Sequence, residues 1–231
     1  MIRRDYLLRQ IEQFVATLTR IVGLTKNEQW PEAATATDDE FRRLTGMAAL
    51  EVLRMSETEL LARLIEGEPA SGVEAKAFML ATLLKTKGDL LAGQERWEDS
   101  RAYYLKGLHL LLGTVSRSEI TERPDFAPTV EAFLTGLRDS PLPLETGGLL
   151  MRHYEQTREF AKAEDTLFGI LDAAPTSAKL LDFGKLFYQR LLGLSDRVLA
   201  EGNLPRPEAQ AGLAELEKRR ANLSGTADGG G

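Results

Sequence analysis

The sequence predicts an all-α protein in which antiparallel helical hairpins stack on one another. Aromatic residues make up 7% of the chain, leucine is abundant and runs of β-branched residues are rare, a balance that favours helices over strands. One pattern also recurs three times, at residues 29–33, 96–100 and 159–163: a polar residue, an aromatic residue, two further residues and a small residue. A turn pattern repeated along a helical sequence indicates repeated helix-turn-helix units, so we expect about ten helices arranged as stacked hairpins.

The first element is a long helix with one apolar stripe. Steps of four and three residues separate the members of this stripe, Leu7, Ile11, Phe14, Leu18 and Ile21. That spacing places all five on one helix face. Two interpretations follow: the stripe packs against its own domain, or it pairs with the same stripe of a second copy to form a homodimer.

Up to residue 67, several residues predict where helices end and begin. Gly23 and Gly46 suit C-caps, and Pro31 suits the first turn of a second helix, because an N–H is not needed there. Ser56 and Glu59 have the spacing of a capping box and predict a further short helix.

The middle of the chain predicts one hairpin and a following helix. A helix from Val73 leads to the turn at Trp97, where the return arm begins. Residues 116–119 repeat the capping-box spacing, and Pro124 and Pro128 predict irregular backbone up to about residue 129.

In the last third, we expect a hairpin around Phe160 and then a helix with an unusually wide apolar stripe. The stripe is broad enough to predict burial on two sides, and its members are Leu180, Leu181, Phe183, Phe187, Leu191, Leu192, Leu194, Val198 and Leu199. Gly202 is expected to cap this helix, and residues 206–223 to form a mostly polar final helix.

Breaker-rich stretches divide the chain into four segments. Glycine, proline and small residues cluster at 67–72, and prolines follow at 141 and 143. We therefore expect N-terminal hairpins over 1–67, a hairpin with its following helix over 73–139, and a hairpin with capping helices over 144–223. These three segments are expected to form one continuous domain. Residues 224–231 have almost no side chain to bury and are predicted to be disordered.

Charge and composition exclude several classes of protein. The net charge of -6 argues against a general electrostatic hold on nucleic acid. The absence of cysteine excludes disulfides, thiol catalysis and cysteine metal ligands. We find neither an export signal nor an apolar stretch that could cross a bilayer, so no membrane association and a cytoplasmic location are expected.

No residue pattern in the chain predicts catalysis, a cofactor or a metal. The two histidines, His109 and His153, lie far apart, and neither has a glutamate three positions before it. The glycines lack phosphate-loop spacing, and acidic residues near helix starts are explained by the helix dipole. We assign no catalytic, cofactor-binding or metal-binding residue.

The segment with Gly88, Trp97, Ser100, Tyr104 and Gly107 resembles one tetratricopeptide repeat, although Glu95 stands where that family has its turn glycine. The segment around Tyr154 and Ala163 fits the same pattern, with Met151 where glycine is expected. The turn aromatics are 67 and 63 residues apart, near twice the ~34-residue period of that family. By this resemblance the fold is a tetratricopeptide-like superhelix or a compact helical array, in which each turn aromatic packs beneath the next hairpin.

Residues 5–13 and 21–24 also resemble the start of an uncharacterised bacterial family with tetratricopeptide-like hairpins. Repeat proteins of this kind imply a concave surface, lined by first-arm helices, that binds a protein or peptide. The candidate lining residues are Tyr103, Tyr104, Tyr154 and Arg158.

Two functions remain open. The first is a non-catalytic interaction module whose groove binds a protein or peptide segment. The second is a small-ligand-binding regulator or enzyme with a pocket between helices, built from His153, Tyr154 and Arg158. A deep closed pocket favours the second function, whereas an open groove with a hydrophobic floor and a polar rim favours the first.

Overall fold

The computed structural model describes residues 2–65, 70–116, 123–137 and 141–227, and within these ranges the chain forms twelve helices and no strand. The predicted all-α fold is therefore confirmed. The chain divides into two compact units, Met1–Ser140 and Pro141–Gly231, and each unit is described by itself.

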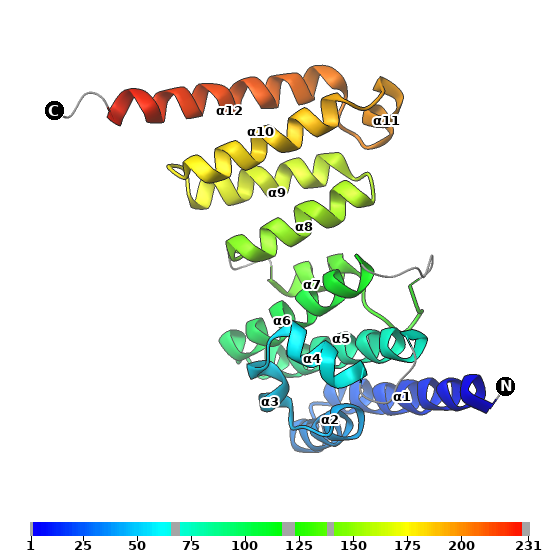
Figure 1. Cartoon of the computed structure of the whole chain (residues 1–231). Helices are drawn as coiled ribbons and strands as arrows, with labels where there is room; N and C mark the ends of the chain where they lie inside the picture. Colours follow the sequence, from blue (N-terminus) through cyan, green and yellow to red (C-terminus); the bar gives the residue numbers. More distant parts are fainter. Residues whose placement is uncertain (1, 66–69, 117–122, 138–140, 228–231) are drawn as a thin grey trace. The chain divides into compact units, whose positions relative to one another are not determined.

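The first unit is organised around one central helix, α5 (Figure 1). This helix contacts α1, α2, α4, α6 and α7. Its apolar residues are buried on several faces, with Phe78, Leu80 and Leu83 almost inaccessible to solvent, as expected of a helix that is hydrophobic all round. The helices of this unit are α1 (Ile2–Lys26), α2 (Trp30–Thr45), α3 (Ala49–Arg54), α4 (Glu57–Ile65), α5 (Ala70–Gly93), α6 (Trp97–Val115) and α7 (Val130–Leu137).

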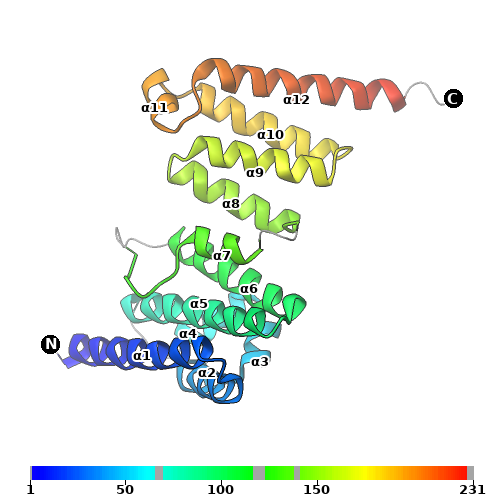
Figure 2. The same ribbon diagram turned by 180° about the vertical axis from the view of Figure 1, so that it is seen from behind.

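In the second unit, α8 and α9 form a hairpin, and α12 packs along α10, as both ribbon views show (Figures 1 and 2). Gly147 lets α8 and α9 approach closely, because a Cβ there would lie 2.4 Å from Ile170 Cδ1. The helices of this unit are α8 (Leu144–Gln156), α9 (Phe160–Ala173), α10 (Ala178–Leu192), α11 (Asp196–Glu201) and α12 (Arg206–Ala227).

The recurring sequence pattern corresponds to one backbone turn. The residue before each pattern, Glu28, Glu95 or Arg158, has a positive φ of 57°, 60° or 61°. The next backbone N–H then donates to the carbonyl five residues earlier, over 2.8 to 3.0 Å. This bond is the outer hydrogen bond of a Schellman helix end, so each turn closes one helix and begins the next.

A fourth turn of this kind follows α11 and has no aromatic residue to mark it. Asn203 has a φ of 56°, and the N–H of Leu204 donates to the carbonyl of Leu199 at 3.0 Å. Asparagine tolerates this left-handed conformation better than most residues. Gly202 is the C-cap residue of α11, as expected, but its φ of -86° is not left-handed, and Asn203 takes the left-handed position instead.

The expectation that every turn aromatic packs beneath the next hairpin is wrong for Trp97. Trp30 lies against Gly93, at the end of α5, and Phe160 lies against Gly202 and is only 2% exposed. Trp97 is 65% exposed. The helix that follows α6 in this unit, α7, packs near Tyr104 and Gly107, about two helical turns beyond Trp97, and therefore leaves the indole in solvent.

Several predicted helix ends are confirmed and others are corrected. Gly46 is a left-handed cap with a φ of 74°, and the backbone N–H of Ser56 donates to Glu59 at 2.8 Å, as a capping box requires. Gly23 instead lies inside α1, where its carbonyl accepts from the N–H of Asn27 at 3.1 Å. The helix predicted through residue 199 breaks after Leu192.

The break after Leu192 follows from a glycine and a new cap. Gly193 comes directly after α10, and the Ser195 hydroxyl then accepts from the N–H of Val198 to begin α11. The wide stripe is also not buried on two sides, since its members Phe183 and Leu194 are exposed.

Helix α12 extends to Ala227, so the predicted disorder is wrong for residues 224–227. Residues 228–231, the breakers at 67–69 and most of the second predicted capping box, at 117–119, lie outside the described residues.

Candidate binding groove on the second unit

The tyrosines predicted to line a partner groove are packing residues, which corrects that assignment. Tyr103, Tyr104 and Tyr154 are each nearly completely buried and offer almost no surface to a partner. The hydroxyl of Tyr104 donates to Asp89 at 2.7 Å, and its ring lies against Gly88. Burial and this carboxylate raise the pKa of Tyr104 above its ordinary value.

His153, Tyr154 and Arg158, the residues predicted for the alternative ligand site, lie where α8 ends and α9 begins. His153 and Tyr154 have ring centroids 5.5 Å apart, and Lys162 lies 5.3 Å from the centre of the Tyr154 ring. Arg158 occupies the left-handed turn position and is exposed. These residues therefore stabilise the junction between α8 and α9 and line no cavity of that hairpin that the structure describes.

The predicted dimer stripe packs largely against its own unit. Phe14 and Ile21 are fully buried, and the ring of Phe14 meets that of Phe126 edge-on at 5.6 Å. Leu7, Ile11 and Leu18 are half-buried. The prediction that this stripe contacts a second copy is therefore wrong for Phe14 and Ile21, because neither side chain has surface exposed to a second copy.

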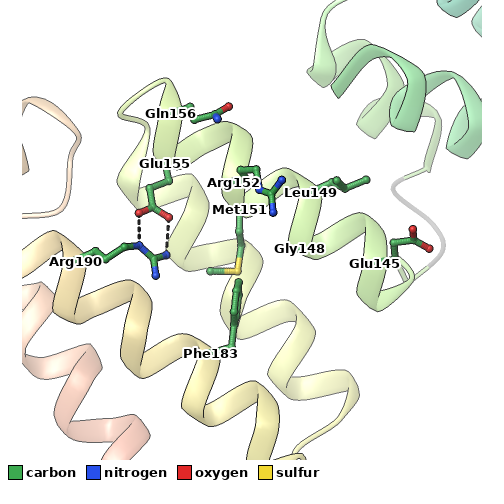
Figure 3. A pocket seen from close by; sticks show the side chains of 9 residues that line it. All are labelled: Glu145, Gly148, Leu149, Met151, Arg152, Glu155, Gln156, Phe183 and Arg190. Atoms are coloured by element: carbon green, nitrogen blue, oxygen red, sulfur yellow. Dashed lines mark hydrogen bonds and ion pairs between the residues drawn. The ribbon is translucent and has the colours of Figure 1, made fainter. Parts of the chain in front are cut away.

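A groove of about 780 Å³ lies on α8 and α10, on a face that the sequence analysis did not single out (Figure 3). We call it the α8–α10 groove. Its lining residues recur every three or four positions on α8, so they share one helix face. They are Glu145, Gly148, Leu149, Met151, Arg152, Glu155 and Gln156 of α8, and Phe183 and Arg190 of α10.

The groove has an apolar floor. Met151 is buried and extends from α8 toward Phe183 of α10, which keeps part of its ring exposed (Figure 3). Gly148 has no atom within 4 Å of the place where a Cβ would stand, so the groove is open there and packing does not require a glycine. An exposed phenylalanine over a buried methionine offers an adaptable apolar contact.

An ion pair between Glu155 and Arg190 lies at one end of the groove (Figure 3). Arg190 donates from Nε to Glu155 Oε1 at 2.7 Å and from Nη2 to Oε2 at 2.8 Å. This hydrogen bonding raises the pKa of Arg190 above its ordinary value, while burial acts in the opposite direction. The bidentate pair joins α8 to α10.

Arg152 is a cationic residue at the rim of the groove (Figure 3). It is exposed and makes no hydrogen bond or ion pair with any residue that the structure describes. Its guanidinium presents five donors in a fixed fork that matches a carboxylate. The groove therefore combines an apolar floor with an unoccupied cationic group at its rim.

His109, in the first unit, belongs to a structural cluster. Its Nδ1 lies 3.7 Å from Glu57 Oε1, to which Lys106 also donates at 3.2 Å. Burial raises the pKa of Glu57, but its own backbone N–H and Lys106 outweigh burial, so this pKa lies below its ordinary value. The cluster ties the start of α4 to α6. Across the described ranges, no group of three or more acidic or histidine side chains could hold a metal ion.

A family model described as a family of unknown function, DUF6483, matches residues 1–221. The chain belongs to this family. Membership in DUF6483 names no activity, and no curated protein or solved structure matches the chain. Of the described helices, none is both long enough and apolar enough to cross a membrane.

Proposed function

We propose that this member of DUF6483 is a non-catalytic interaction module that binds a protein segment in the α8–α10 groove. The observation that carries the proposal is the make-up of the groove, an apolar floor of Met151 and Phe183 beneath a polar rim. Open sites of this composition are typical of protein interfaces, whereas small-molecule sites enclose most of the ligand surface.

The order of the helices supports a tetratricopeptide-like arrangement of this groove. Helix α8 is the first arm of the α8–α9 hairpin, and α10 is the first helix after that hairpin. First arms line the concave binding surface of helical repeat proteins. The repeated Schellman turns at Glu95 and Arg158 agree with the same architecture.

The chemistry of the groove suggests what the bound segment carries. An aliphatic or aromatic side chain fits the floor at Phe183, and a carboxylate fits Arg152. The carboxylate of Glu155 is already bound to Arg190, so it does not compete for Arg152.

The test is a capture experiment with the tagged full chain and its native lysate, read by mass spectrometry. We expect a partner that Phe183→Ala and Arg152→Glu each lose. Leu194→Ala removes a similarly exposed apolar side chain, and Lys179→Glu reverses an exposed charge, both outside the groove; these controls should keep the partner.

Two results would contradict the proposal. One is a partner that both groove variants retain. The other is a small molecule that native mass spectrometry finds on the purified chain and that Phe183→Ala releases, since this would favour the ligand-binding alternative.

A further inference from the structure

Two rim residues of the α8–α10 groove carry opposite charges and have no charged partner among the described residues. Glu145 and Arg152 both line the groove and are exposed. Neither makes a hydrogen bond or an ion pair with any residue that the structure describes. The other charged lining residues, Glu155 and Arg190, bind each other. The groove therefore offers one carboxylate and one guanidinium of its described rim to a bound segment.

The two rim charges have a fixed spacing. Glu145 and Arg152 are seven positions apart, close to two turns of α8, so they lie on one helix face about 10 Å apart along its axis. Arg152 directly follows Met151 and lies beside the apolar floor, whereas Glu145 lies at the start of α8 (Figure 3). Gly148 and Leu149 line the groove between them. The charges thus distinguish the two directions along the groove.

Given the proposed function, on which this inference rests, the rim charges define the chemistry of the bound segment. We propose that the segment carries a carboxylate beside an apolar side chain, for Arg152 and the floor, and a basic group about 10 Å away, for Glu145. A segment with its apolar side chain beside the basic group instead would place like charges together. Complementary charges fix the orientation of a bound segment and exclude wrong partners more than they add affinity.

The distance between the rim charges limits the spacing of acidic and basic residues in the bound segment. A span of about 10 Å corresponds to three residues of extended chain at ~3.3 Å per residue. In a helix, with a rise of ~1.5 Å per residue, it corresponds to seven residues. The spacing found in a bound peptide therefore also indicates its conformation.

The test uses the immobilised full chain and a displayed library of random peptides of ~12 residues, long enough to span the groove as a helix. Peptides that also bind the Phe183→Ala chain are discarded, so the remaining peptides are those that need the apolar floor. We expect them to carry an acidic residue close to an apolar residue, with a basic residue three or seven positions from the acidic one.

A charge swap in the chain gives the matched comparison. Glu145→Arg combined with Arg152→Glu exchanges the two rim charges and keeps the net charge. A selected peptide should bind the unaltered chain about tenfold more tightly than the swapped chain, and its charge-inverted counterpart should show the reverse preference, as fluorescence anisotropy can measure. Glu98→Lys combined with Lys218→Glu is the control. Both residues are exposed and lie outside the groove, so the dissociation constants should not change.

Two results would overturn the predicted charge order and leave the proposed function standing. One is a set of selected peptides that bind the unaltered and the swapped chain equally, and the other is a set with no preferred spacing of acidic and basic residues. A library that yields no peptide dependent on Phe183 would contradict the proposed function as well.

Discussion

The turns that contain Glu95 and Arg158 have nearly the same backbone and opposite surroundings. Their left-handed residues differ by 1° in φ, at 60° and 61°. Their aromatic residues, two positions further on, differ widely in exposure: Trp97 is 65% exposed and Phe160 is 2% exposed.

The recurring sequence pattern has two separate roles: the backbone forms the turn, and the aromatic side chain can stabilise the fold. Backbone hydrogen bonds and the left-handed residue make the turn in both places, so burial of the aromatic is not needed for the conformation. The aromatic residue stabilises the fold only where a neighbouring element covers it, as the end of α11 at Gly202 covers Phe160. Substitutions at these positions therefore test whether the two turns differ in this way.

The largest effect is expected for Phe160→Ala. Removing a fully buried ring should lower the free energy of unfolding by about 3–5 kcal/mol, measured by urea denaturation. Phe160→Leu is the control and should cost less than about 1.5 kcal/mol, because it keeps most of the packing. A loss from Phe160→Ala smaller than that of Phe160→Leu would show that the ring is not packed as described.

Gly202→Ala tests the other side of the same contact. A Cβ there would lie 2.2 Å from Phe160 Cδ2 and 2.7 Å from the backbone carbonyl oxygen of Arg158, so we expect a loss of about 1–3 kcal/mol. In the Phe160→Ala background the loss should shrink, because the ring is gone. Gly169→Ala is the control: nothing lies within 4 Å of its Cβ position, and it should be neutral or stabilising by up to about 1 kcal/mol. Additive effects of the two substitutions would argue against direct contact.

Smaller and equal effects are expected at the left-handed residues themselves. Glu95→Gly and Arg158→Gly should each stabilise by about 0.5 kcal/mol, since relief of left-handed strain exceeds the entropic cost of glycine. Glu98→Gly, in the first turn of α6, should instead cost up to about 1 kcal/mol. Thermal melts of the three variants distinguish these signs, and opposite signs at positions 95 and 158 would mean that the two turns are not equivalent.

The smallest effect is expected for Trp97→Ala. Because most of the indole is in solvent, the free energy of unfolding should change by no more than about 0.5 kcal/mol. The intrinsic fluorescence should fall while the melting temperature stays close to that of the unaltered chain. A loss comparable to that of Phe160→Ala would place Trp97 in a buried contact and remove the distinction between the two turns.

The sequence was sufficient for features that depend on neighbouring residues. The all-α fold, the Gly46 cap and the capping box of Ser56 and Glu59 are local, since each depends on propensity or on hydrogen bonds within a few residues. The helix end near residue 202 was predicted, but its likeness to the other three turns was missed because no aromatic residue marks it. Its signal was the asparagine, which accepts a left-handed conformation.

Features that depend on packing could not be read from the sequence in the same way. Nothing near Trp97 or Phe160 in the chain says which ring is covered, because Gly202 lies over forty residues beyond Phe160. The α8–α10 groove was missed for the same reason: Arg152 looks like an ordinary surface residue of α8, and Phe183 was assigned to a buried stripe. Only the pairing of α8 with α10 brings these two side chains to one groove.

Several helix contacts join helices that follow one another in the chain, such as α1 with α2, α5 with α6 and α8 with α9. Contacts that are close in sequence require little loop-closure entropy and form early. Each such hairpin can therefore form as soon as its second arm has left the ribosome. The first unit, by contrast, is complete only after α5 has been synthesised, because α5 contacts both α1 and α2.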